Sequence, residues 1–176
     1  MRTIIFIFTI LVFITGCDNN KFLEYIGLKE RVTNVKQERN GITYLPNEEE
    51  PFTGKYEIFY SGGQKKVEGS YKYGKLEGLF ISWFENGQKE CETNYLKGEK
   101  QDGLSICWFE NGQKSSERNF KDGEREGLSI FWFENGQKSS ERNFKDGTEN
   151  GLLTVWNKSG QKIREVNYKD GIEVIK

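Results

Sequence analysis

The sequence predicts an all-β protein, an elongated single-layer antiparallel meander of β-hairpin repeats. The first observation is internal repetition, because similar segments open at the glycines Gly54, Gly78, Gly103, Gly127 and Gly151. The intervals are 24, 25, 24 and 24 residues, and self-similarity at a fixed period is the signature of a repeat architecture. The second observation is composition: 20 glycines, 2 prolines and 14% aromatic residues favour many short strands joined by tight turns.

Each repeat is predicted to form one hairpin. In residues 103–126, Leu104, Ile106 and Trp108 alternate with the residues between them, which is the two-residue period of a strand. Asn111-Gly112 follows, and this dipeptide predicts a tight hairpin turn in which both residues have positive φ. Residues 114–120 then return as the second strand, and residues 121–123 turn the chain into the next repeat. The five repeats therefore supply about ten strands.

Aligned repeats place aromatic residues in columns. The column assigned to packing of the fold contains Phe59, Trp83, Trp108, Trp132 and Trp156. The next column, which Asn157 interrupts, contains Tyr60, Phe84, Phe109 and Phe133. A third column contains Tyr71, Tyr95, Phe120, Phe144 and Tyr168. Consecutive side chains of a strand point to opposite faces, and an exposed aromatic row usually marks recognition. The second column is therefore the predicted binding surface, with packing as its alternative.

The N-terminal residues predict export. Residues 4–14 are apolar except for Thr9, and the run is too short to span a bilayer as a helix. It is typical of the apolar region of a signal peptide. The run ends in Ile14-Thr15-Gly16-Cys17, which resembles a bacterial lipobox. That resemblance implies cleavage after Gly16 and lipid on Cys17, so we expect a membrane-anchored protein in the cell envelope that faces away from the cytoplasm. An ordinary secretory signal or an uncleaved anchor is the alternative.

The remaining boundaries follow from these patterns. Residues 1–16 are the predicted signal peptide, 17–30 the lipidated cysteine and tether, 31–53 a cap hairpin, and 54–176 the five repeats. In the cap, residues 32–35 and 42–45 alternate around Asn40-Gly41 and are predicted to pair, because an open array needs an end cap over its exposed edge. Residues 172–176 are predicted to supply a final edge strand.

Charged residues recur with the repeat period. Glu85, Glu110 and Glu134 stand at the turns, and Glu92, Glu117, Glu141 and Glu165 stand on the second strands. We expect solvated ladders across strands, formed with Lys89, Lys114, Lys138, Arg118 and Arg142. The chain has no histidine, and nothing in it suggests a catalytic residue, a metal site or a cofactor. The formal net charge of the chain is -1, so it does not provide the positive electrostatic field that nucleic-acid binding needs. The sequence therefore predicts a binding protein and not an enzyme.

Two cysteines interrupt the repeat pattern. Cys91 and Cys107 stand where other repeats carry Val, Ser or Phe, on strands joined by the turn at residues 97–103. In an exported protein they are candidates for a disulfide. Free, half-buried thiols remain an equal alternative.

The repeated motifs Trp-Phe-Glu-Asn-Gly-Gln-Lys and Asn-Phe-Lys-Asp-Gly, with the segments 39–44 and 51–54, carry a family resemblance. Residues 31–176 resemble the variant MORN repeat and, more specifically, the bacterial YwqK-type antitoxin family of toxin–antitoxin systems. The resemblance implies a hairpin-repeat fold and a protein-binding role of antitoxin or immunity type, with a toxin or an envelope protein as partner. The alternative is a structural or scaffold lipoprotein that binds a glycan or another envelope component.

Overall fold

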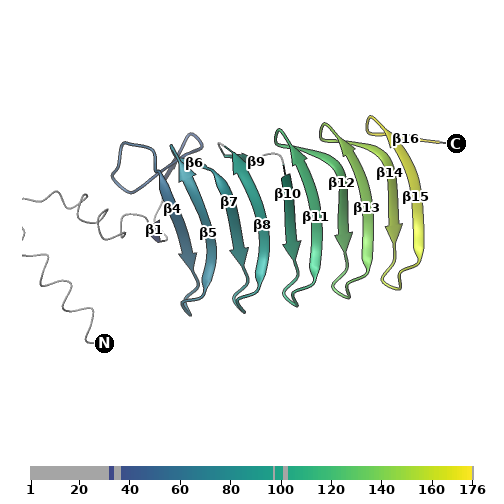
Figure 1. Cartoon of the computed structure of the whole chain (residues 1–176), viewed down its shortest axis with the longest axis horizontal. Helices are drawn as coiled ribbons and strands as arrows, with labels where there is room; N and C mark the ends of the chain where they lie inside the picture. The colour runs from purple at the N-terminus through teal and green to yellow at the C-terminus, as the bar shows by residue number, and fades with distance from the viewer. Residues whose placement is uncertain (1–31, 34–36, 97, 101–102, 176) are drawn as a thin grey trace, which may run out of the picture. The chain divides into compact units, whose positions relative to one another are not determined.

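The computed structural model describes residues 32–33, 37–96, 98–100 and 103–175. They belong to one compact unit, Val32–Lys176. The described residues form an all-β fold, as the sequence predicted, with a 14-stranded sheet and a 2-stranded sheet (Figure 1). No helix that could cross a membrane occurs in this part of the chain.

Ten strands of the large sheet form five consecutive antiparallel hairpins. They are β4 (Gly54–Phe59), β5 (Lys65–Lys72), β7 (Gly78–Trp83), β8 (Lys89–Leu96), β10 (Gly103–Trp108), β11 (Lys114–Lys121), β12 (Glu124–Trp132), β13 (Lys138–Lys145), β14 (Thr148–Trp156) and β15 (Lys162–Lys169). The short strands are β1 (Val32–Thr33), β6 (Lys75–Leu76), β9 (Glu99–Lys100) and β16 (Ile172–Val174). Strands follow one another in chain order across the sheet, and β16 forms the C-terminal edge as predicted.

The two ends of each hairpin use different turns. At the Asn-Gly end, the Phe109 N–H donates to the Gln113 carbonyl and the Gly112 N–H donates to the Phe109 carbonyl, which closes a three-residue loop. Only Gly112, at φ 82°, has positive φ there, so the prediction that Asn111 shares it is wrong. The paired positive φ values occur instead at the corners between repeats, as in Asp122 (48°) and Gly123 (83°). In a two-residue loop both residues need positive φ, whereas in a three-residue loop only the last residue needs it.

A β-bulge beside each three-residue turn determines which side chains share a face. Trp108 lies opposite Lys114 but Cys107 lies opposite Ser116, so Ser115 is an extra residue. This shift brings Lys114 and Glu117 onto one face, where they form an ion pair of 2.7 Å within one strand. The predicted ladders across strands are therefore wrong for the lysines.

The bulge also separates the arginines from that ladder. Arg118 follows Glu117 directly on β11 and points to the opposite face, and Arg142 follows Glu141 in the same way on β13. The prediction that these arginines join the lysine–glutamate ladders is wrong as well.

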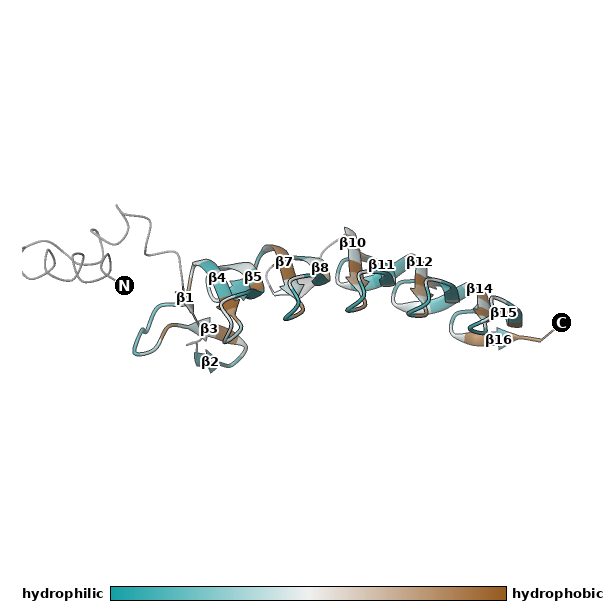
Figure 2. Cartoon of the chain, turned by 90° about the horizontal axis from the view of Figure 1, so that it is seen from below, coloured by the Kyte–Doolittle hydropathy of each residue, from teal (hydrophilic) through white to brown (hydrophobic). Residues whose placement is uncertain are grey.

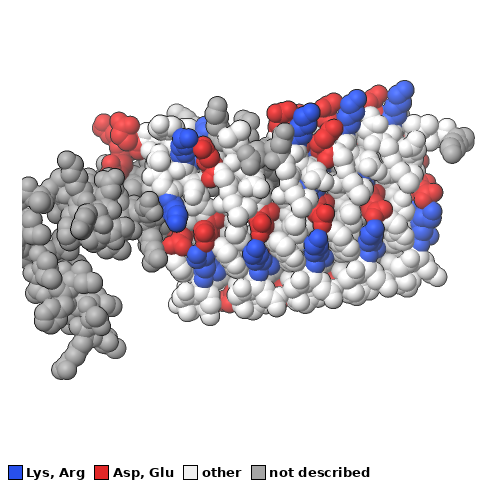
Figure 3. Space-filling model, viewed as in Figure 1, with Lys and Arg blue, Asp and Glu red and all other residues white. Residues whose placement is uncertain are grey.

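The sheet thus has two different faces. The tryptophan face carries the tryptophan column and the lysine–glutamate pairs, which form a row across the strands (Figure 3). Lys89 lies 5.9 Å from the ring centre of Trp108 and Lys114 lies 5.9 Å from that of Trp132, so each lysine contacts the following repeat. The inner face carries the third aromatic column, of which Tyr71, Phe120 and Phe144 are buried.

The cap differs from its prediction. The hairpin around Asn40-Gly41 pairs β2 (Gln37–Arg39) with β3 (Ile42–Tyr44), while β1 pairs in parallel with β4 in the large sheet. Thus Val32 and Thr33 are not a strand of the cap hairpin, and residues 34–36 lie outside the described residues. The cap hairpin lies beside β4 and β5 on one side of the sheet (Figure 2). Near it, Phe52, Tyr56 and Tyr71 form the buried core of the first repeat.

Candidate binding surfaces

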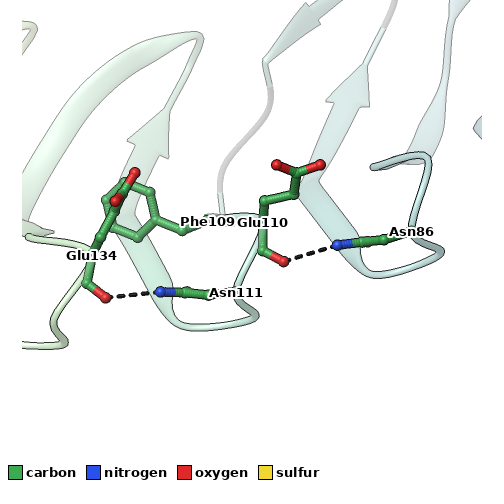
Figure 4. A pocket seen from close by; sticks show the side chains of 5 residues that line it. All are labelled: Asn86, Phe109, Glu110, Asn111 and Glu134. Carbon is green, nitrogen blue, oxygen red and sulfur yellow. Dashed lines mark hydrogen bonds between the residues drawn. The ribbon is translucent and has the colours of Figure 1, made fainter.

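The predicted binding residues lie at the edge where the three-residue turns begin. Tyr60, Phe84, Phe109 and Phe133 are all half-buried, each as the first residue of its turn. Phe109 lines a shallow pocket together with Asn86, Glu110, Asn111 and Glu134 (Figure 4). We call this series of aromatic residues and neighbouring glutamates the turn row. It is partly exposed, so its rings are available to a ligand as well as to packing.

Asparagines hold successive turns in register. The side-chain amide of Asn86 donates to the Glu110 carbonyl at 2.9 Å, and that of Asn111 donates to the Glu134 carbonyl at 2.8 Å (Figure 4). The Asn111 side-chain oxygen also accepts from the Gln113 N–H at 3.0 Å. Each asparagine therefore closes its own turn and fixes the next one. The walls of the Phe109 pocket come from three repeats and are positioned before any ligand arrives.

The turn row is acidic at its three phenylalanines, each of which a glutamate follows, whereas Lys66 lies 5.3 Å from the ring centre of Tyr60. The hydroxyl of Tyr60 donates to the Trp83 carbonyl at 2.8 Å, so this ring lies against the next repeat. The pKa of Tyr60 is raised, first by partial burial of its ring and then by the negative charges of Glu90, Glu85 and Glu110. Aromatic rings beside carboxylates suit a cationic group, which gains from ring faces and from opposite charge.

The structure joins Cys91 and Cys107 by a disulfide, with their Cα atoms 4.1 Å apart. The two residues lie directly opposite each other on β8 and β10. The bridge therefore links the second repeat to the third, across the connection that contains the extra residue. Cys17, the predicted lipidation site, lies outside the described residues.

Sequence reasoning missed a polar row on the inner face. Arg118 lies opposite Ser129 on the neighbouring strand, and Ser129 lies opposite Arg142 on the strand after that. The same central inner position holds Gly69, Thr93 and Val166 in the other repeats. The signal was therefore present in the aligned repeats, where arginine replaces a small or apolar residue at two inward positions. These positions could be assigned to the inner face only once the structure had shown where the bulge lies.

No group of three or more His, Cys, Asp or Glu side chains within the described ranges is placed to hold a metal ion.

Four segments of the chain match the family model described as MORN repeat variant, at residues 52–73, 76–97, 101–122 and 125–146. The fifth hairpin, β14 and β15, has the same strand register although it lies beyond these matches. A comparison with curated proteins found no match.

Proposed function

Because this chain belongs to the MORN repeat variant family, we propose that it is a protein-binding repeat module anchored in the cell envelope by lipid on Cys17. Its partner docks along the turn row through basic side chains. The observation that carries this proposal is the pocket that the half-buried Phe109 lines together with Glu110 and Glu134. The same residue types recur in the preceding repeat as Phe84 and Glu85, so a partner can repeat its contacts.

The spacing of the repeats supports an extended partner segment. A two-strand repeat advances by about 10 Å across a sheet. Basic residues three positions apart in a polyproline II segment are separated by roughly 9 Å and lie on one side of it. Such a segment can place successive basic side chains against successive rings of the turn row. We infer that this partner is a toxin and that the chain neutralises it, as an antitoxin or immunity protein does.

Removal of the Phe109 ring should weaken partner capture. We expect the Phe109→Ala full-length protein, used as bait in detergent-solubilised membranes, to retain less of its partner than the unmodified chain. A buried aromatic anchor contributes on the order of 2 kcal/mol to an interface, which corresponds to roughly thirtyfold in affinity. Quantitative mass spectrometry of the captured proteins measures this loss, and capture should also decrease as salt concentration rises.

Leu128→Ala provides the matched control. Leu128 is 39% exposed and belongs to β12, outside the turn row, so its truncation removes exposed apolar surface without touching the pocket. A partner captured equally by Phe109→Ala and the unmodified chain, or lost equally from Leu128→Ala, does not dock on the turn row. For the antitoxin role, the captured protein should inhibit growth when produced alone and cease to do so when this chain is co-produced.

The lipid anchor has its own test. We expect Cys17→Ser to leave the membrane fraction or to accumulate as an unprocessed precursor, because serine has no thiol to accept the lipid. Fractionation of cells, together with gel mobility, measures this outcome. A Cys17→Ser protein that fractionates and migrates like the unmodified chain contradicts the anchor but leaves the turn-row proposal standing.

A further inference from the structure

Two neighbouring repeats provide an internal comparison at the inner face. Residues 103–126 and 127–150 differ at four aligned positions, namely Cys107 and Phe131, Glu124 and Thr148, Arg125 and Glu149, and Glu126 and Asn150. Three of these four lie together at the start of β12 or β14, directly after the corner, and we count these residues with the corner below. The difference between the two repeats is therefore concentrated where the corner meets the inner face.

In the fourth repeat this corner neutralises an arginine. The guanidinium of Arg142 donates to the Glu149 carboxylate at 3.0 Å. In the fifth repeat Glu173, which aligns with Glu149, also pairs with an arginine of the inner face, because Arg164 donates to it at 2.9 Å from a position two residues before the equivalent of Arg142. An arginine that lies over the inner face is thus paired with a carboxylate from the following corner.

In the third repeat the same corner position carries a second cation. Arg125 stands where Glu149 stands one repeat later, and neither Arg118 nor Arg125 has a carboxylate partner among the described residues. Arg118 is half-buried, and its pKa is lowered first by burial and then by the charge of Arg125. Its guanidinium donates to the Ser116 hydroxyl at 3.0 Å and lies 6.0 Å from the Phe131 ring centre. Two adjacent cations at a partly dry surface are therefore left uncompensated.

Packing accounts for the length of Arg118 but not for its charge. On the inner face, large and small residues oppose each other, as Tyr56 opposes Gly69 and Phe80 opposes Thr93. Ser105 opposing Arg118 keeps this balance of volume, which a methionine would also keep. An unpaired guanidinium in partly buried surroundings carries a desolvation cost that an apolar side chain of similar length avoids.

Unpartnered polar atoms lie at the same place. Ser129 is fully buried, and its hydroxyl has no hydrogen-bond partner. The Nε atoms of Arg118 and Arg142, which flank Ser129 on the two neighbouring strands, are also without partners. Among the described residues, these three atoms are the buried side-chain nitrogen and oxygen atoms without a hydrogen-bond partner, and all three belong to one row across neighbouring strands.

We propose that Arg118 and Arg125 form a binding site for an oxyanion, a carboxylate, phosphate or sulfate group, on the inner face of the third repeat. Guanidinium groups bind such anions through charge-assisted hydrogen bonds, often two at a time. The anion supplies the negative charge that Glu149 supplies to Arg142 in the next repeat. This site is separate from the turn row and has the opposite charge preference.

Titration calorimetry of the full-length chain in detergent tests the site, with inorganic phosphate, sulfate and acetate as separate ligands and sodium chloride holding ionic strength constant. Arg125→Glu recreates the ion pair of the fourth repeat and should fold normally, but it should lose phosphate affinity by about tenfold or more. Arg118→Met, which keeps the side-chain length, should lose it as well. Arg164→Glu makes the same change in net charge two repeats away and should bind phosphate like the unmodified chain.

The three anions identify the source of the ligand group. Binding of phosphate and sulfate without acetate assigns a tetrahedral group, binding of acetate alone assigns a carboxylate, and binding of all three shows a site that accepts any oxyanion. Binding of none of them overturns the proposal. Equal phosphate affinity in Arg125→Glu and the unmodified chain overturns it too, as does an equal loss in Arg164→Glu.

Discussion

Replacement of Gly74 by alanine is expected to detach the cap hairpin and destabilise the N-terminal end of the array. Gly74 is buried at the first corner with φ 75°, and its N–H donates to the Phe52 carbonyl at 2.7 Å. A Cβ at this position would lie 2.8 Å from the Thr43 carbonyl oxygen and closer still to the Ile42 side chain. These atoms belong to β3, so the cap hairpin must move to make room.

The expected cost has two parts. An alanine in the left-handed region costs about 1–2 kcal/mol, and forcing a methyl group into a packed contact costs about 1–3 kcal/mol more. Movement of the cap hairpin also uncovers the core of Phe52, Tyr56 and Tyr71. Urea unfolding followed by circular dichroism measures the free energy of unfolding. Hydrogen exchange should show the loss of protection concentrated in β4 and β5.

Gly63→Ala separates the two parts. Gly63 has a similar φ of 85°, but no atom lies within 4 Å of the place its Cβ would take. It should therefore lose only the backbone part, about 1–2 kcal/mol. Equal destabilisation by both variants would mean that the cap hairpin does not pack against the first corner.

Reduction of the Cys91–Cys107 bridge is expected to weaken the junction between the second and third repeats. β8 and β10 share two residue pairs in register, whereas β11 and β12 share five. The bridge spans a sequence separation of 16 residues, and a loop of about that size corresponds to roughly 3 kcal/mol of stabilisation. Without the bridge, this junction keeps the buried hydrogen bond of 2.7 Å between Thr93 and Ser105 and that of 2.9 Å from Asn86 to the Glu110 carbonyl, so the two repeats should stay paired but be held less firmly.

Thermal unfolding with and without dithiothreitol checks this prediction. The unmodified chain should melt several degrees lower when reduced, while the double variant Cys91→Ser with Cys107→Ser should melt at the lower temperature under both conditions. Serine fits the site, because Ser116 occupies the position of Cys91 in the next repeat. The disulfide prediction fails if mass spectrometry of envelope-purified protein shows two free thiols, or if reduction leaves the melting temperature unchanged.

The amino-acid sequence alone determined the repeat period, the hairpin built on each period and the aromatic columns. These depend on local properties: glycine tolerates positive φ, and alternating side chains require a strand with two different faces. The same alignment was sufficient to select Phe109 and its equivalents as binding candidates. It could not supply the other walls of the Phe109 pocket, because Asn86 and Glu134 come from the preceding and following repeats.

Only the tertiary structure decided which residues share a face. A single extra residue, such as Ser115, reverses the direction of every following side chain on its strand relative to the turn. That reversal pairs Lys114 with Glu117 and turns Arg118 toward Arg125 and the inner face. The sequence pattern of a strand has a period of two and contains no mark of a bulge. The bulge lies beside the closed three-residue turn, so its position became visible only in the folded hairpin.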